Sequence, residues 1–149
     1  MAPHGQALTL CTNSTVYRWG LRRRCDAALK PTALSMAQYA VLRTLADHPE
    51  ASAAELARLC FVTRQSLQDV LGGLRAAGLV GSSEAPLRGR ARSLRLTRQG
   101  KRRLDAGDTA IASVERAILQ GIPVGSRGEL VAWLTRCAEN LQAAASWGD

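Results

Sequence analysis

Two short helices separated by a tight turn, and followed by an arginine-rich hairpin, form the pattern in residues 52–100 that most restricts the fold. Ser52 and Glu55 make an S-x-x-E capping box, which marks the start of the first helix. Thr63 is expected to cap the second helix. The apolar side chains of the first helix are expected to face inward: Leu56, Leu59 and Cys60.

The second helix carries apolar residues at three- and four-residue spacing, which predicts one buried face: Leu67, Val70, Leu71 and Leu74. Gly78 is expected to end this helix, because glycine readily takes the left-handed conformation that follows a helix. Leu79 and Val80 then begin an extended segment, and residues 93–96 return with strand-like alternation. Helix, turn, helix and hairpin together predict a winged helix-turn-helix.

Positive charge is concentrated in the same region. Residues 63–103 hold ten basic residues against Asp69 and Glu84, so this segment has a net charge of +8, equal to that of the whole chain. An excess confined to one helix–hairpin unit indicates a surface that binds a polyanion, whereas a scattered excess would indicate only a solvated face. The basic residues are Arg64, Arg75, Arg88, Arg90, Arg92, Arg95, Arg98, Lys101, Arg102 and Arg103.

Two helices are expected before this module. The first extends from about residue 9 to residue 29, where Lys30 and Pro31 close it. The second begins at a capping box formed by Ser35 and Gln38 and continues to about residue 46.

Two more helices, each with an apolar seam, are expected after the module. Thr97 is expected to cap the first, and a third S-x-x-E box at Ser126 and Glu129 predicts the start of the second. A neighbouring helix of the same chain could cover one seam, but two seams exceed what so small a module covers, so the sequence predicts a homodimer. The seams are Leu104, Gly107, Ile111, Val114, Ile118 and Gly121, then Leu130, Leu134, Cys137 and Leu141.

The predicted fold is mainly α with a small β-hairpin wing: a winged helix-turn-helix with N- and C-terminal dimerisation helices. Residues 1–33 form the N-terminal dimerisation helix, residues 34–97 the DNA-binding domain, and residues 98–149 the C-terminal helices that complete the dimerisation domain. At 149 residues the chain is long enough for one domain with a core.

Several classes of protein are disfavoured by what the chain lacks. Its four cysteines are far apart and its two histidines are isolated, so neither a disulfide framework nor a metal site is expected. No cofactor is expected either. No apolar run approaches the roughly 20 residues that span a bilayer, and the first residues do not resemble a signal peptide, so we expect a cytoplasmic protein without a membrane partner. No catalytic constellation is recognisable, and an enzyme is not expected.

The second helix of the module is expected to enter the major groove of double-stranded DNA. Arginine pairs with guanine and glutamine with adenine, so Arg64, Gln65 and Gln68 are candidate base readers. Thr63 and Ser66, at the helix start, suit phosphate contacts. At the hairpin tip, arginines alternate with small residues and fit the narrow minor groove: Arg88, Arg90 and Arg92.

In this order and spacing, several short motifs make the sequence resemble the MarR (multiple antibiotic resistance regulator) family over nearly its whole length. They are Asp26-Ala-Ala-Leu-Lys-Pro31, Leu34-Ser35 with Gln38-Tyr39, Leu74-Arg-Ala-Ala-Gly-Leu-Val80 and Leu96-Thr97-Arg-Gln-Gly100. The resemblance implies a homodimer on a pseudo-palindromic operator, usually a repressor that a small ligand or oxidation releases. Where the family often has D-x-R at the hairpin tip, Arg90 matches the arginine and Arg88 replaces the aspartate.

Two kinds of inducer site remain open. Cys11 resembles the sensing cysteine of the family's organic-peroxide branch, but the two tyrosines of that branch align with Cys25 and Met36. Cys25 follows three arginines, a basic neighbourhood that favours a reactive thiol, although a structural role for both cysteines is the simpler interpretation. A ligand pocket between the dimerisation helices and the DNA-binding module is the other option. Its large candidates are Trp19, Tyr17, Met36 and Tyr39, and core packing is the simpler role for each.

The leading hypothesis is therefore a dimeric regulator of transcription, with a small-molecule inducer as a possible further partner. A winged helix that binds protein or RNA without operator specificity is the alternative. The arginine-rich hairpin and the polar second helix favour duplex DNA, because the core of a protein interface is depleted of charge.

Overall fold

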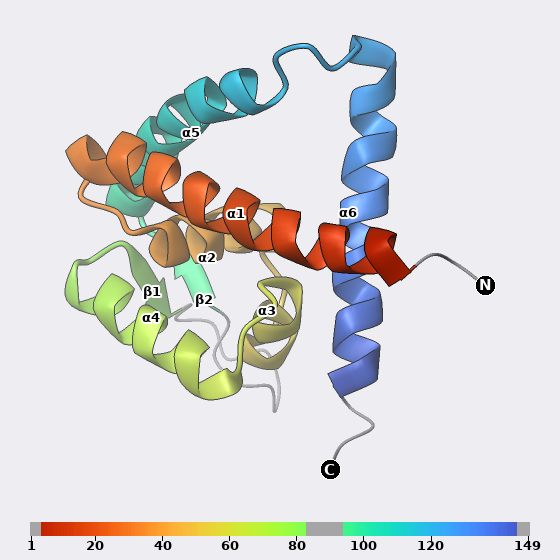
Figure 1. The fold of residues 1–149 in the computed structure, drawn as a ribbon. Coiled ribbons are helices and arrows are strands. Elements are labelled where there is room, and N and C mark those ends of the chain that lie inside the picture. The colour runs from red at the N-terminus through yellow and green to blue at the C-terminus, as the bar shows by residue number, and fades with distance from the viewer. Residues whose placement is uncertain (1–3, 83–93, 146–149) are drawn as a thin grey trace.

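The computed structural model describes residues 4–82 and 94–145, and the side chains of residues 17–82 and 94–143. It is mainly helical with one antiparallel pair of short strands, as the sequence predicts (Figure 1). The elements in chain order are α1 (His4–Leu29), a 3₁₀ turn (Lys30–Thr32), α2 (Met36–Asp47), α3 (Ala53–Leu59), α4 (Arg64–Ala76), β1 (Val80–Ser82), β2 (Leu94–Leu96), α5 (Arg98–Ile118) and α6 (Val124–Ala145).

Side-chain caps fix the starts of four of the helices. Ser35 Oγ accepts the Gln38 backbone N–H at 3.1 Å while Gln38 Oε1 accepts the Ser35 N–H at 3.0 Å, which confirms the predicted capping box of α2. Ser52 and Glu55 make the same reciprocal pair at α3. The hydroxyls of Thr63 and Thr97 accept backbone N–H groups at the starts of α4 and α5 in the predicted way.

The starts of α1 and α6 differ from the prediction. α1 begins at His4, about five residues earlier than expected. α6 begins at Val124, so the predicted capping box at Ser126 and Glu129 is wrong. The Pro123 carbonyl accepts the Ser126 N–H at 3.0 Å, and the first turn is therefore already wound where the cap was expected.

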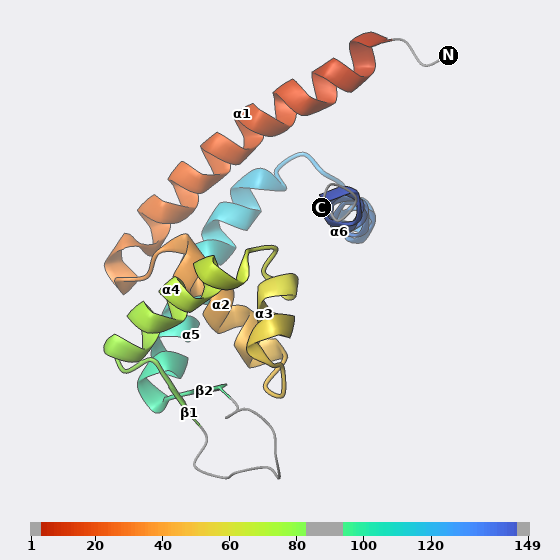
Figure 2. The same ribbon diagram turned by 90° about the horizontal axis from the view of Figure 1, so that it is seen from below.

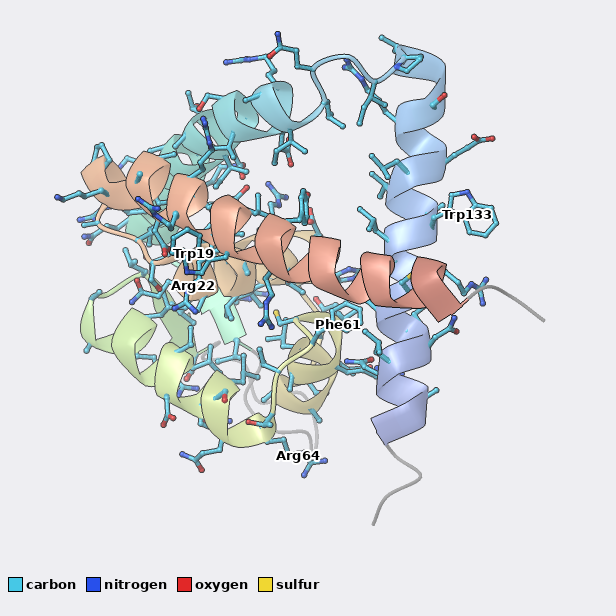
Figure 3. All side chains as sticks on the ribbon, viewed as in Figure 1. Trp19, Arg22, Phe61, Arg64 and Trp133 are labelled. Carbon is cyan, nitrogen blue, oxygen red and sulfur yellow. The ribbon has the colours of Figure 1, made fainter. Side chains whose placement is uncertain are left out.

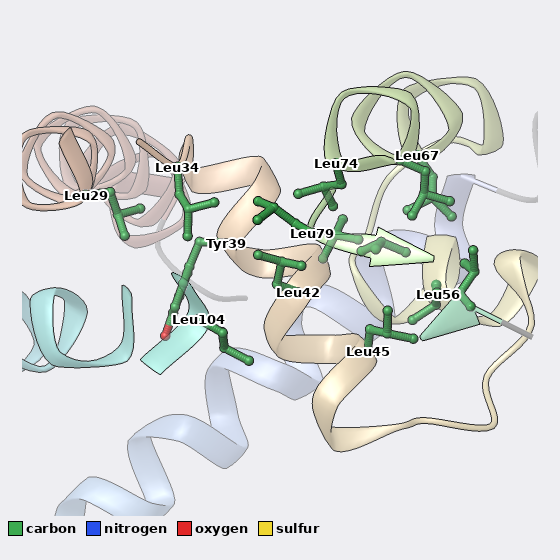
Figure 4. Close-up of a cluster of buried hydrophobic side chains, with 14 of the residues drawn as sticks. Leu29, Leu34, Tyr39, Leu42, Leu45, Leu56, Leu67, Leu74, Leu79 and Leu104 are labelled. Carbon is green, nitrogen blue, oxygen red and sulfur yellow. The ribbon is translucent and has the colours of Figure 1, made fainter. Parts of the chain in front are cut away.

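The hydrophobic core joins the end of α1 with α2, α3, α4, β1, β2 and α5 (Figure 4). Its fully buried side chains are almost all leucines, in keeping with helix packing: Leu29, Leu42, Leu45, Leu56, Leu67, Leu71 and Leu74. Leu59 departs from the prediction, because this last residue of the seven-residue α3 is 37% exposed. Val70 and Cys60 are only partly buried.

The predicted seam of α5 is covered by the same chain. α1 packs along α5, and α2 packs on it from the other side of the seam (Figure 1). At Gly107 a Cβ atom would lie 2.8 Å from the Tyr39 ring, so the absence of a side chain lets α2 approach closely. Leu104, Ile111 and Val114 are buried in this contact.

α6 stands apart from α2, α4 and α5 in Figure 1, and Figure 2 shows that α1, which crosses in front of it in the first view, also lies apart from it. One contact joins its far end to α3, where Gln142 Nε2 donates to the Arg58 carbonyl at 3.4 Å. Its large apolar side chains are exposed: Val124, Val131, Trp133, Leu134 and Leu141. In Figure 3 Trp133 points away from the body of the molecule. The seam of α6 therefore lacks the cover that α5 receives.

Candidate nucleic-acid interface

The first turns of α4 form the polar surface of the helix-turn-helix. Thr63 Oγ1 accepts the Ser66 N–H at 3.1 Å and donates to Ser66 Oγ at 2.9 Å, which leaves the remaining N–H groups of this first turn facing outward. The opposite side of the helix is anchored by Leu67, Leu71 and Leu74 in the core. Every residue predicted here to contact DNA is exposed: Thr63, Arg64, Gln65, Ser66 and Gln68.

Gln65 has a partner on the same helix. Its Nε2 donates to Asp69 Oδ1 at 3.1 Å, one turn further along. This hydrogen bond restrains the side-chain amide and leaves its oxygen available as an acceptor. Arg64, at the first helical position, projects from the end of α4 that is nearest the turn (Figure 3).

The wing begins and ends in the described strands. Val80 pairs with Leu96, and Gly81 lies opposite Arg95, whose side chain is exposed. The three arginines predicted to enter the minor groove, Arg88, Arg90 and Arg92, lie outside the described residues.

A clamp ties the base of the wing to the end of α4. The Thr97 hydroxyl donates to the Gly78 carbonyl at 2.7 Å and accepts the Gly100 N–H at 2.9 Å. A Cβ atom at position 100 would lie 2.0 Å from the Leu79 carbonyl oxygen, so only glycine allows α5 to start this close to β1. Gly78 has a φ of 69°, which confirms its predicted place after α4.

The first turns of α5 add positive charge beside the wing. Arg98, Lys101 and Arg102 are exposed there. Arg103 has a structural role instead, because its Nη1 donates to the Thr32 carbonyl at 2.7 Å and holds the 3₁₀ turn against α5. The described part of the concentrated charge belongs to α4, β2 and the start of α5: Arg64, Arg75, Arg95, Arg98, Lys101, Arg102 and Arg103.

The candidate inducer residues are only partly brought together. A surface groove of about 500 Å³ separates α1 from the start of α2 and includes Cys25 and Met36. Its lining combines apolar side chains with two arginines and one carboxylate. The lining consists of Arg18, Leu21, Arg22, Cys25, Asp26, Ser35, Met36 and Ala37.

Trp19 and Tyr39 lie elsewhere. Trp19 is 65% exposed, with the Arg23 guanidinium 4.8 Å from its ring, and Tyr17 is 47% exposed, so the core role expected for these two residues is wrong. Tyr39 confirms that role, because its ring is buried between α2 and α5. α1 packs on the core with only one face, and its outer face carries the two aromatics.

The thiol of Cys25 does not have the reactive character that its neighbours in sequence suggest. It is 3% exposed, and burial raises the pKa of the thiol, as do the carboxylates of Asp26 and Glu115. The arginines that precede it point to solvent, since Arg22, for example, is 80% exposed. For Cys11 only the backbone is described, within α1.

Sequence reasoning missed an ion-pair network between α2 and α5. Arg43 Nη1 donates to Asp108 Oδ2 at 2.9 Å, and the Tyr39 hydroxyl donates to Asp108 Oδ1 at the same distance. Arg43 also pairs with Asp47 one turn along α2. The spacing of Arg43 and Asp47 could have revealed the second pair, but no local pattern connects them to Asp108.

The described side chains include no group of three or more His, Cys, Asp or Glu residues suited to a metal ion. No described helix combines the length and the apolar character needed to cross a membrane.

Known proteins that are similar to this chain share its architecture. The MarR family model matches residues 34–91. The HTH-type transcriptional repressor Rv2887 of Mycobacterium tuberculosis is 33% identical over 106 residues, which cover 70% of this chain and 76% of the repressor.

Solved structures extend the similarity to most of the chain. The complex of Rv2887 with DNA is similar with a TM-score of 0.61 and 29% identity, covering 92% of this chain and 98% of that one. Its complex with salicylic acid has a TM-score of 0.65 over 92% and 97% of the two chains. A MarR-family regulator from Rhodococcus sp. RHA1, at 17% identity, shares the fold with a TM-score of 0.76, over 93% and 98%.

The fold, the exposed polar surface of α4 and the similarity to these relatives all lead to the same family. MarR-family proteins regulate transcription and are not enzymes. The chain belongs to the MarR family of transcriptional regulators.

Proposed function

We propose that this protein is a homodimeric repressor that binds a pseudo-palindromic site in double-stranded DNA and releases it when a small ligand binds. The observation that carries the proposal is the start of α4, where Arg64, Gln65 and Gln68 are exposed on a helix anchored by buried leucines. Such a helix presents hydrogen-bonding side chains to base edges in the major groove. The relative Rv2887, which is named a repressor, has been solved in a complex with DNA.

In this proposal each part of the surface has a separate role. Arg64, Gln65 and Gln68 read bases, and Thr63 and Ser66 contact phosphates. The arginines Arg88, Arg90 and Arg92 of the wing enter the minor groove, and the exposed cations at the start of α5 contact the flanking phosphates. Base contacts supply specificity, while phosphate contacts supply most of the salt-dependent affinity.

The homodimer is supported by the exposed apolar face of α6. Five large apolar side chains of this helix are exposed, and a monomer in water gains nothing from such a face. We propose that residues 1–33 and 98–149 form the dimerisation domain around the DNA-binding residues 34–97. A two-fold axis would then place two α4 helices on successive half-sites.

The groove between α1 and α2 is the proposed ligand site. Leu21, Cys25 and Met36 line it with apolar groups, and Arg18 and Arg22 against the single carboxylate of Asp26 give it a net positive charge that would attract an anion. An aromatic carboxylate combines both features, and the relative Rv2887 has been solved with salicylic acid. We propose a ligand rather than oxidation of Cys25 as the releasing signal, because burial raises the pKa of that thiol.

Selection from random duplex DNA with the purified protein tests the proposal. We expect a palindromic site, bound less tightly when salicylate is added. Arg64→Ala should relax the preference at particular base positions, whereas Arg90→Ala should weaken binding to all sequences and reduce its salt dependence. If no site is enriched, or structured RNA competes equally well, the repressor proposal is wrong and a general interaction module becomes the better interpretation.

A further inference from the structure

The turn of the helix-turn-helix exposes three apolar side chains beside the DNA-binding surface. Between α3 and α4, Leu59, Phe61 and Val62 are 37%, 47% and 41% exposed. The next residue is Thr63, which caps α4. We call Leu59, Phe61 and Val62 the turn patch. Any partner that covers the turn patch also fixes the start of α4.

Phe61 occupies a backbone position that suits glycine. Its φ is 55°, in the left-handed region that a bulky side chain rarely adopts. The Phe61 N–H donates to the Arg58 carbonyl at 3.1 Å and the Val62 N–H to the Ala57 carbonyl at 3.0 Å, the arrangement in which helices commonly end with glycine. Phenylalanine here strains the backbone and still leaves about half of its surface exposed, so its side chain is expected to serve a contact outside the chain.

Phe61 of the turn patch lies on the side of the molecule where α6 exposes its large apolar side chains. Figure 3 shows Phe61 on the side of the helix-turn-helix nearest α6. Gln142 Nε2, near the end of α6, reaches the Arg58 carbonyl at the end of α3. The turn patch and the far end of α6 therefore belong to one continuous region of the monomer surface.

Within one chain, α6 covers neither the turn patch nor its own apolar side chains. A second copy of the chain is therefore the partner that fits. Successive residues of a helix are 100° apart around its axis, so the exposed apolar side chains of α6 lie on an arc with Trp133 at one edge and Val131 near the other. This arc covers roughly half of the circumference, more than one neighbouring helix covers. Phe61 and Trp133 together expose on the order of 250 Å², a substantial part of the ~800 Å² that each partner of a stable interface buries. A two-fold axis brings the same two surfaces together twice.

We propose that Phe61 docks against α6 of a second copy of this chain, so that dimer assembly fixes the position of the DNA-binding helix α4. The inference rests on the homodimer of the proposed function and adds a contact between the dimer interface and the helix-turn-helix. Because Phe61 lies two residues before the cap of α4, this contact sets the distance between the two α4 helices. That distance determines the half-site spacing that the dimer accepts.

Phe61→Gly is the informative variant, because glycine suits the left-handed backbone and the variant is expected to fold. Phe61→Leu is the matched control, since it keeps an apolar side chain at the same strained position. We expect Phe61→Gly to raise the dimer dissociation constant about tenfold or more, with Phe61→Leu close to the parent protein. Sedimentation equilibrium measures the constants, and circular dichroism of the dilute proteins checks that both variants are folded.

Operator spacing gives a second readout. We expect the parent protein to bind palindromes of one half-site spacing, and Phe61→Gly to lose this preference when spacers are lengthened or shortened by one base pair. An unchanged dimer with an unchanged spacing preference would overturn the inference while leaving the proposed function intact. Loss of DNA affinity without weaker dimerisation would also overturn it and would assign the turn patch to DNA. A parent protein that stays monomeric would instead remove the homodimer itself.

Discussion

α5 and α6 carry the same kind of apolar seam in sequence and have opposite surroundings in the structure. Leu104, Ile111 and Val114 of α5 are covered by α1 and α2, whereas Leu134 and Leu141 of α6 are 52% and 73% exposed. The periodicity of a helix states that one face will be buried, but it does not state whether the cover comes from the same chain. The difference separates the seam that this chain covers itself from the seam that the proposed homodimer would cover.

An acidic residue placed in each seam should give the largest difference between the covered seam of α5 and the exposed seam of α6. Ile111→Asp places a carboxylate in the core, and we expect it to lower the free energy of unfolding by about 4 kcal/mol or more, enough to unfold a marginal domain. Leu134→Asp should change the unfolding of the dilute protein by less than about 0.5 kcal/mol but raise the dimer dissociation constant on the order of 100-fold.

Urea denaturation followed by circular dichroism, with sedimentation velocity on the same samples, measures both effects. The comparison between the helices fails if Leu134→Asp unfolds the dilute protein as readily as Ile111→Asp does. It also fails if the acidic residue on α6 leaves the association state unchanged.

Glycine-to-alanine changes should also affect the stability of the two helices differently, but by smaller amounts. At Gly107 of α5 the added methyl group would lie 2.8 Å from the Tyr39 ring, and we expect a loss of about 1–3 kcal/mol from overpacking. Gly128 of α6 has open space around the position of a Cβ atom, so alanine should stabilise that helix by up to about 1 kcal/mol. Denaturation midpoints at low protein concentration give the two values. Equal effects at both sites would contradict the close contact at Gly107.

Tyr39→Phe tests the polar part of the α2–α5 contact, with the smallest expected effect. Losing the 2.9 Å hydrogen bond to Asp108 should cost about 1 kcal/mol at neutral pH. Burial and this hydrogen bond raise the pKa of Tyr39 above its usual value near 10, because they favour the neutral phenol in the folded state. Its contribution to stability is therefore complete below pH 10 and is lost as the pH rises above that value.

The pH dependence of unfolding provides the measurement. Between pH 9 and pH 11 the parent protein should lose stability more steeply than Tyr39→Phe. Tyr17→Phe, on the exposed face of α1, is the matched control for removing a phenol hydroxyl. Parallel stability curves for the parent protein and Tyr39→Phe would show that Tyr39 does not resist ionisation in the folded state.

Local sequence rules predicted the framework well where neighbouring residues decide the outcome. The caps at Ser35, Ser52 and Thr63 involve partners three residues away, and all three were found where expected. The same rule failed at Ser126, because the Pro123 carbonyl closes the first turn of α6 earlier. A capping motif predicts a helix start only when nothing upstream begins the helix first.

The candidate site was predicted less completely because its environment depends on distant residues. Cys25 follows three arginines in sequence, but the fold turns those side chains to solvent and buries the thiol, which raises its pKa. Asp108 joins Tyr39 and Arg43 across more than 60 positions of sequence, and no periodicity encodes such a pairing. The left-handed backbone of Phe61 depends on how α3 ends, and the residue type itself does not predict it.

By itself the sequence determined the order of the helices, the position of the wing and the polar surface of α4, because caps, glycines and apolar spacing act over a few residues. Tertiary structure alone decided which seam is buried in the chain, which thiol is shielded and which apolar side chains stay exposed. Burial depends on what packs against a face, and that partner can be far away in sequence or in another molecule.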